Sequence, residues 1–256
     1  MLAMTVQSLD RAFDILELLS REQHGLNLTE IGNRLELHKS TVYRLLQALK
    51  QRGYIAKTEQ GSYRLGMEFI ELSSLYLNNL ELKTEAQPIL RELSSLSGNT
   101  AFLATLQDNE VVYIDKMETH NSLRKYSIIG QRAPLYCTAL GKSMLTGRTE
   151  GQIRLLYKDR ELEAFTDRTI TSVNDLVAEI DKIRSQGFSV DDEEYEEGLR
   201  CIGAPIRDYR AEVIGAVSTS GYASVITRER VDEIAAYVVR AARDISQRMG
   251  YRGQQG

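Results

Sequence analysis

Five polar residues between positions 39 and 47 combine the side-chain types that recognise and hold nucleic acid. On a helix they fall on one face: Lys39, Ser40, Tyr43, Arg44 and Gln47. Arginine can donate two hydrogen bonds to a guanine edge, and glutamine can pair with adenine in the same way. Lysine and serine at a helix start suit a phosphate. We therefore expect this face to enter the major groove of DNA.

Two further residues extend this polar surface. Thr41 lies beside it, and Arg64 falls in a later segment from which it could reach the adjacent groove or phosphates. The alternative is a solvated polar face on a small helical bundle, which periodicity alone does not exclude. The order of elements favours DNA binding, because a capped short helix, a tight turn, a polar third helix and a hairpin follow one another.

The segment before this surface is predicted to be helical in two places. From Ser8 to Glu22, apolar residues recur at three- and four-residue steps, which indicates a helix with one buried face. That face consists of Leu9, Ala12, Phe13, Leu16 and Leu19. After Gly25, the run from Asn27 to Glu30 is typical of a capping box at the start of a short helix.

The polar surface itself belongs to a third predicted helix, from Lys39 to Arg52, which Gly53 ends. Its inward side chains are Val42, Leu45, Leu46 and Leu49. Short strands on either side of Gly61 then predict a β-hairpin. These elements make an all-α, winged helix-turn-helix N-terminal domain over residues 5–66. Residues 67–82 are expected to form a linker helix with an apolar face to bury, against a second copy of the chain.

Residues 83–250 mix helices and strands and predict an α+β domain. Pro88 is expected in the first turn of a helix that ends near Gly98. The predicted strands cover 100–106, 111–117, 123–129, 188–191, 201–206 and 213–220. The predicted helices cover 139–146, 150–157, 174–186 and a closing helix to Met249 that Thr227 caps. Helices over an antiparallel sheet are typical of a sensor domain.

Composition narrows the class of protein. The net charge is −4, but residues 1–66 carry nine Lys and Arg against seven Asp and Glu, and the remainder carries 23 against 29. The N-terminal part is thus at +2, which is compatible with DNA binding. Two cysteines and three scattered histidines predict neither a disulfide framework nor a metal site. We expect a cytoplasmic protein without cofactor, export signal or membrane association.

Several motifs resemble one family of bacterial regulators. Residues 8–65, with Leu28–Ile31 and Lys39–Leu46, are similar to the DNA-binding domain of the IclR family. Residues 134–142 resemble the segment that enters that family's effector pocket. Two further segments, 193–206 and 217–220, resemble its remaining signatures. The resemblance spans nearly the whole chain and implies a GAF/profilin-like effector domain, a homodimer or a dimer of dimers, and a double-stranded DNA operator.

The same resemblance implies where a small organic acid binds. The ligand contacts carried over from the family are Ala133, Ala139, Leu140, Asp191, Leu199, Cys201, Ser218 and Ser220. The residues themselves are compatible with this, because Ser218 and Ser220 alternate along a strand and Leu140 lies at a helix start. Each has a simpler alternative: Cys201 as a small buried hydrophobe, the serines as partners of the backbone, and residues 191–197 as a solvated loop.

One subgroup resemblance narrows the ligand. Residues 123–127 and 191–201 look like regulators that respond to 2-keto-3-deoxygluconate and related sugar acids, with Arg124 or Lys125 available for a carboxylate. A solvent-exposed basic pair is the alternative. The resulting prediction is a ligand-responsive DNA-binding regulator that represses a catabolic operon and is not an enzyme. Other possibilities are an architectural DNA-binding protein and a hydrolase using Cys137 or Cys201.

Overall fold

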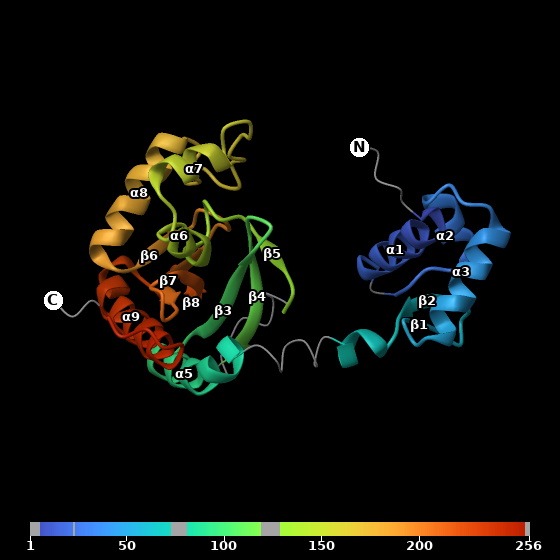
Figure 1. Ribbon diagram of the computed structural model, residues 1–256, viewed down its shortest axis with the longest axis horizontal. Helices are drawn as coiled ribbons and strands as arrows, with labels where there is room; N and C mark the ends of the chain where they lie inside the picture. Colours follow the sequence, from blue (N-terminus) through green and yellow to red (C-terminus); the bar gives the residue numbers. More distant parts are fainter. Residues whose placement is uncertain (1–5, 23, 73–80, 119–128, 254–256) are drawn as a thin grey trace. The chain divides into compact units, whose positions relative to one another are not determined.

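The computed structural model describes residues 6–22, 24–72, 81–118 and 129–253. The chain divides into two compact units between Asn79 and Leu80, and each is described by itself below. Figure 1 shows the N-terminal unit in blue to cyan and the C-terminal unit in green to red.

The N-terminal unit contains α1 (Gln7–Ser20), α2 (Leu28–Arg34) and α3 (Lys39–Gln51), followed by a hairpin. The hairpin strands, β1 (Ile55–Lys57) and β2 (Tyr63–Leu65), pair antiparallel. The core of this unit comprises Ile15, Leu19, Leu26, Ile31, Val42, Leu46, Ile55 and Tyr63. An all-α domain with a small wing was expected here and is confirmed.

Helix α1 differs from its prediction in the face that it buries. Leu9 and Phe13 were expected in the core, but they are 52% and 53% exposed. Leu19 is buried as predicted, and Ile15, which was not predicted, is buried with it. The helix carries two apolar stripes, and the small core of a single chain has room for one of them. The other stripe remains on the surface of the unit.

The predicted linker helix over residues 67–82 can be followed in part. Residues 68–72 are helical, and α5 (Glu81–Ser97) is helical from Glu81 onwards. The intervening residues lie outside the described part of the chain. Pro88, expected in the first turn of its helix, lies inside α5, so that prediction was wrong. Proline frees the carbonyl one turn earlier, and its exposed position lets water bond that carbonyl.

An antiparallel sheet organises the C-terminal unit, with its described strands in the order β5-β4-β3-β8-β7-β6. Strands β3 (Thr100–Gln107) and β4 (Glu110–Met117) form the predicted hairpin through Asp108 and Asn109, both with positive φ. The remaining strands are β5 (Arg132–Ala133), β6 (Ser189–Asp192), β7 (Leu199–Arg207) and β8 (Val213–Tyr222). Most of the strand predicted over 123–129 lies outside the described residues.

Helices cover both faces of this sheet (Figure 1). On one face, α5 packs with α9 (Val231–Arg248). A short 3-10 turn, η1 (Arg228–Arg230), precedes α9. Thr227 therefore precedes the turn rather than α9 and makes no side-chain capping bond to the backbone, which corrects its predicted role. The C-terminal unit is thus the α+β domain that the sequence predicted.

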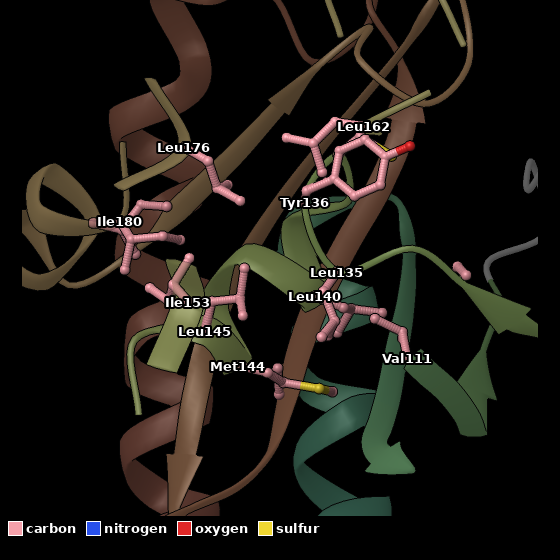
Figure 2. Close-up of a cluster of buried hydrophobic side chains, with 14 of the residues drawn as sticks. Val111, Leu135, Tyr136, Leu140, Met144, Leu145, Ile153, Leu162, Leu176 and Ile180 are labelled. Carbon is pink, nitrogen blue, oxygen red and sulfur yellow. The ribbon is translucent and has the colours of Figure 1, made fainter. Parts of the chain in front are cut away.

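The opposite face of the sheet carries α6 (Ala139–Leu145), with α7 (Glu150–Leu156) and α8 (Val173–Gln186) beyond it. Figure 2 shows side chains from these elements, and from Val111 and Leu135, gathered into one apolar cluster. Leu140 and Leu145 of α6 and Leu176 and Ile180 of α8 are almost completely buried there. This cluster fixes α6 relative to the sheet.

Candidate functional site

The polar face of α3 stands clear of the core beneath it. Val42 and Leu46 are fully buried, and this orientation leaves Lys39, Tyr43, Arg44 and Gln47 exposed. Within the described residues, none of these four side chains forms a hydrogen bond or ion pair. Their donors are therefore available to an external partner, which is what base recognition requires.

The start of α3 is organised by a residue that the sequence analysis missed. His38 precedes the helix, and its Nδ1 lies 3.4 Å from the amide nitrogen of Ser40 and 2.8 Å from its hydroxyl. Ser40 is exposed and Thr41 is half-buried. Histidine is a rare cap, so composition gave no signal for this role.

Two sets of hydrogen bonds stabilise the elements next to α3. The predicted capping box of α2 is confirmed: Asn27 accepts from the amides of Thr29 and Glu30, and Glu30 accepts from the Asn27 amide at 2.7 Å. The wing packs through Tyr63, whose backbone pairs with Leu26 at 2.7 and 3.0 Å. Arg64, the next residue, is exposed on β2.

The second candidate site begins with a row of side chains across the sheet of the C-terminal unit. Asp191 on β6 pairs with Cys201 on β7, which pairs with Ser220 on β8. Ser218, two residues earlier on β8, lies opposite Phe102 of β3. The row is polar, and the Cys201 thiol donates to the Ser220 hydroxyl at 3.0 Å.

Helix α6 closes over this row because the backbones approach closely. A Cβ on Gly203 would lie 2.8 Å from the Ala139 carbonyl oxygen, so β7 needs glycine at that position. The Ser189 hydroxyl donates to the same carbonyl at 2.6 Å and contacts the Ser143 hydroxyl at 2.8 Å. The start of α6 is thereby fixed above the polar row.

A cavity of about 430 Å³ lies between α6, the sheet and the loop after β6. Seven of the predicted effector contacts line it: Ala139, Leu140, Asp191, Leu199, Cys201, Ser218 and Ser220. Ala133 is not brought to it. That residue, on β5, pairs with Val111 of β4 and packs in the apolar cluster with Leu135 and Leu140.

The cavity also has walls that the sequence analysis did not identify. They are Phe102, Tyr113, Gln131, Thr138, Phe165, Tyr195 and Glu196. Thr138 lies within the quoted segment 134–142, and Tyr195 and Glu196 lie within the acidic run, so both segments held a signal. Phe165 lies in a stretch without helix or strand periodicity, and nothing local marked it.

The loop after β6 is partly buried rather than fully solvated. Asp191 and Glu194 are 4% and 7% exposed, whereas Glu196 and Glu197 are exposed. The Oδ1 atom of Asp191 accepts from the amides of Glu194 at 2.8 Å and Tyr195 at 3.4 Å. Burial, reinforced by the neighbouring Glu194 charge, raises the pKa of Asp191 to about 7.

Lys142 anchors this loop to α6. Its side chain is fully buried, forms an ion pair with Glu194 and donates to the Val190 carbonyl at 2.6 Å. Thr138 accepts from the Gly141 amide, so the first turn of α6 already has one of its amides bonded. The ammonium group of Lys142 thus binds partners within the protein, and Lys142 does not line the cavity.

The two cysteines are poorly suited to nucleophilic chemistry. Burial raises the pKa of both Cys137 and Cys201, which keeps the thiols protonated. His24 and His38 belong to the N-terminal unit, and His120 lies outside the described residues. Among the residues that the structure describes, no group of His, Cys, Asp and Glu is placed to hold a metal ion. In the same part of the chain, no helix has the length and apolarity to cross a membrane.

An exposed helix-turn-helix surface in one unit and a cavity with polar groups in the other are the features of a DNA-binding regulator with an effector domain. Family comparison agrees with this class. The IclR helix-turn-helix domain matches residues 8–59, and the bacterial transcriptional regulator IclR C-terminal domain matches residues 74–247. The chain belongs to the IclR family of bacterial transcriptional regulators, a non-enzymatic family.

Individual relatives extend the match over nearly the full length. The chain is 40% identical to the HTH-type transcriptional regulator KdgR of Escherichia coli (strain K12), over 96% of this chain and 94% of that protein. It is 34% identical to the transcriptional repressor IclR of the same organism, over 94% and 89% respectively. The crystal structure of the Thermotoga maritima IclR superposes with a TM-score of 0.84 at 32% identity, covering 96% of this chain and 100% of that one.

Proposed function

We propose that this regulator controls a catabolic operon and that a small organic acid, of the sugar-acid class, changes its affinity for the operator. The observation that carries the proposal is the cavity beneath α6, where Asp191, Ser218 and Ser220 offer hydrogen-bonding groups beside aromatic walls. Hydroxyl-rich ligands need such groups in an otherwise apolar pocket. The 191–201 segment, which resembles the sugar-acid subgroup, supplies one side of that cavity.

Repression is the proposed direction of control. One relative, 34% identical over most of both chains, is named a transcriptional repressor. A repressor needs an operator-bound state and a released state with different effector affinity. The linker, proposed over 67–82 between a DNA-binding domain of 5–66 and an effector domain of 83–250, would carry the change between them.

Operator contacts are proposed for the exposed surface of α3 and the wing. The residues are Lys39, Ser40, Thr41, Tyr43, Arg44, Gln47 and Arg64. Arg44 and Gln47 would specify bases, since they lie one turn apart and have no partner in the described chain. The remaining residues would position the helix through phosphates.

A homodimer, alone or as a dimer of dimers, is the proposed form on DNA. Leu9 and Phe13 on α1, and Val6 directly before it, form an apolar stripe, each at least half exposed. Met67 and Ile70 add exposed apolar surface to the same unit. Such stripes are costly on a monomer, and a symmetric pair would also present two α3 helices to two half-sites.

The test combines a ligand screen with an operator assay. Full-length protein would be titrated with hexuronate-derived acids, glyoxylate, pyruvate and aromatic acids, while thermal unfolding and fluorescence anisotropy on footprinted operator DNA are followed. At one hundred times Kd, a cognate acid adds about 2.7 kcal/mol of stability, a rise of roughly 5–10 °C. Operator affinity that no acid changes would favour a ligand-independent architectural protein.

A further inference from the structure

The cavity is unusual for a site that receives an acid, because its own charges are negative. Among its described lining residues, Asp191 and Glu196 are acidic and none is Lys, Arg or His. A carboxylate entering it would meet the buried carboxyl group of Asp191, where repulsion between like charges is strong. An acid effector therefore needs compensation for its charge.

Among the described residues one buried cation near this space, Lys142, is already ion-paired, while Arg124 and Lys125 lie outside the described residues. Lys142 is fully buried and ion-paired with Glu194, and its Nζ donates to Val190 and lies 3.8 Å from Glu179. It does not line the cavity. Moving it towards a ligand would leave Glu194, 7% exposed, without its partner, which is costly for a buried ion.

Asp191 is arranged to offer one oxygen to a ligand. Oδ1 is held by the backbone amides of Glu194 and Tyr195, which fix the carboxyl group. Among the described residues, both hydrogen bonds that the carboxylate accepts go to Oδ1, which leaves Oδ2 for a ligand in the cavity that Asp191 lines. If protonated, this oxygen becomes a donor aimed at the ligand.

The groups around Asp191 come from several elements. They are Lys142 of α6, Cys137 before it, Cys201 of β7, and Glu194, Tyr195 and Glu196 of the following loop. Burial and Glu194 oppose ionisation of Asp191, while Lys142 and the two amides favour it. The resulting pKa of about 7 means that protonation is accessible near neutrality.

We propose that a carboxylate effector enters this cavity together with one proton, which is shared between the effector carboxylate and Oδ2 of Asp191. The proton comes from solvent and no covalent bond changes. This inference rests on the proposed acid effector and adds its regulation: the affinity for the effector depends on pH through Asp191. The regulator thereby senses acid and proton concentration together.

The sign of the dependence follows from linkage. Effector binding stabilises protonated Asp191, so the pKa of this group is higher in the complex than in the free protein. Below the free pKa the proton is already present and affinity is independent of pH. Above it each complex takes up a proton, and Kd rises roughly tenfold per pH unit.

The experiment measures that proton directly in the full-length protein. Pyruvate and 2-keto-3-deoxygluconate would be titrated by calorimetry at pH 6 and pH 8, in buffers of low and high ionisation enthalpy. For a free pKa near 7, the expected uptake is about 0.9 protons per site at pH 8 and about 0.1 at pH 6. Uptake near zero at pH 8 for an acid that binds would overturn the inference.

Asp191→Asn identifies the group responsible. Asparagine keeps the Oδ1 acceptor for both amides but cannot ionise, so uptake should vanish and Kd should change less than about twofold between pH 6 and 8.5. Glu197→Gln is the matched control, because it removes the same charge from an exposed position of the same loop, outside the cavity lining. It should retain the uptake. Full uptake in Asp191→Asn would overturn the assignment.

Two further results separate this inference from the proposed function. Pyruvamide, the neutral counterpart of pyruvate, should bind without proton uptake and without the decline in affinity above pH 7. If an acid binds without proton uptake, the proposed acid effector is supported and the shared proton is ruled out. If none of the screened acids binds between pH 5.5 and 8.5, both the acid effector and the shared proton are ruled out. Should Asp191→Asn fail to fold, the wild-type buffer comparison decides alone.

Discussion

The two units of this chain hold their polar functional side chains in opposite surroundings. On α3, Arg44 and Gln47 stand in solvent above a helix face whose Val42 and Leu46 are completely buried. In the C-terminal unit, Asp191 on β6 and Ser218 on β8 are 4% and 2% exposed and line the cavity beneath α6. The polar side chains of α3 lie outside the core of their unit, while Asp191 and Ser218 are buried inside theirs.

This difference has a consequence for mutation. Substituting an exposed, unpaired side chain changes what the protein binds and leaves its free energy of unfolding nearly unchanged. Substituting a buried polar group disturbs binding and stability together, because its neighbours lose a partner that water cannot replace. Function and stability should thus be separable in the N-terminal unit and coupled in the C-terminal unit.

The largest effect is expected at Lys142. Lys142→Met leaves Glu194 buried without its partner and should lower the free energy of unfolding by about 3–5 kcal/mol in urea denaturation. The double variant Lys142→Met with Glu194→Met should recover much of that loss. As a control, Arg154→Ala breaks an exposed ion pair with Glu150, in which the Arg154 side chain is 45% exposed and the Glu150 side chain 58%. This substitution should lower the free energy of unfolding by at most about 1 kcal/mol. A Lys142→Met protein as stable as wild type would contradict the coupling.

Arg44→Ala tests the opposite half of the comparison. Loss of a bidentate base contact should weaken operator binding by about 1–3 kcal/mol and remove discrimination against non-specific DNA. The unfolding free energy should stay within about 0.5 kcal/mol of wild type. Lys50→Ala changes another exposed residue of α3 and is the control. It should weaken binding to operator DNA and to non-specific DNA to a similar extent. A footprint identical to wild type for Arg44→Ala would show that the base-reading assignment is wrong.

A smaller effect is expected when Ser218 and Ser220 are both changed to alanine. Removing two hydroxyls from the cavity should reduce acid affinity by roughly 10- to 30-fold, since each hydrogen bond contributes about 1 kcal/mol. Operator binding without ligand should persist. Calorimetry and anisotropy measure the two properties, with Ser185→Ala on the exposed side of α8 as control. An unchanged thermal shift with the cognate acid would count against the cavity.

The smallest effect concerns a structural residue of the N-terminal unit. Asn27→Ala removes the acceptor for the amides of Thr29 and Glu30, at 2.9 and 3.1 Å, and should cost about 1 kcal/mol of stability. Operator affinity well below the melting temperature should not change, because α3 keeps its exposed face. Asn33→Ala, exposed on α2, serves as the control. Loss of affinity in proportion to stability would weaken the proposed separation.

Local patterns were sufficient for most of the N-terminal unit. The Asn27–Glu30 capping box and the inward face of α3 were predicted correctly because both depend on residues within one or two turns. The exposure of Leu9 and Phe13 could not be predicted in this way. Which of two apolar stripes is buried depends on the room that other helices leave, and that is not a local property.

The cavity of the C-terminal unit shows the same limit more strongly. The family resemblance identified seven of its lining residues. No local pattern indicated that Phe165 would join them, or that Lys142 would pair with Glu194. Ala133 was grouped with the cavity and lies in the apolar cluster instead. Contacts across 52 residues, such as that of Lys142 with Glu194, exist only once the sheet and α6 are assembled.

The sequence by itself therefore determined the polar face of α3 that we propose binds DNA, since helix periodicity places Lys39, Ser40, Tyr43, Arg44 and Gln47 on one face whatever surrounds it. It also determined the two-part organisation and the family. The tertiary structure decided the electrostatics of the cavity that we propose binds the effector. Burial of Asp191, and the pairing of Lys142 away from the cavity, arise from strand register and helix docking, because desolvation depends on everything packed around a charge.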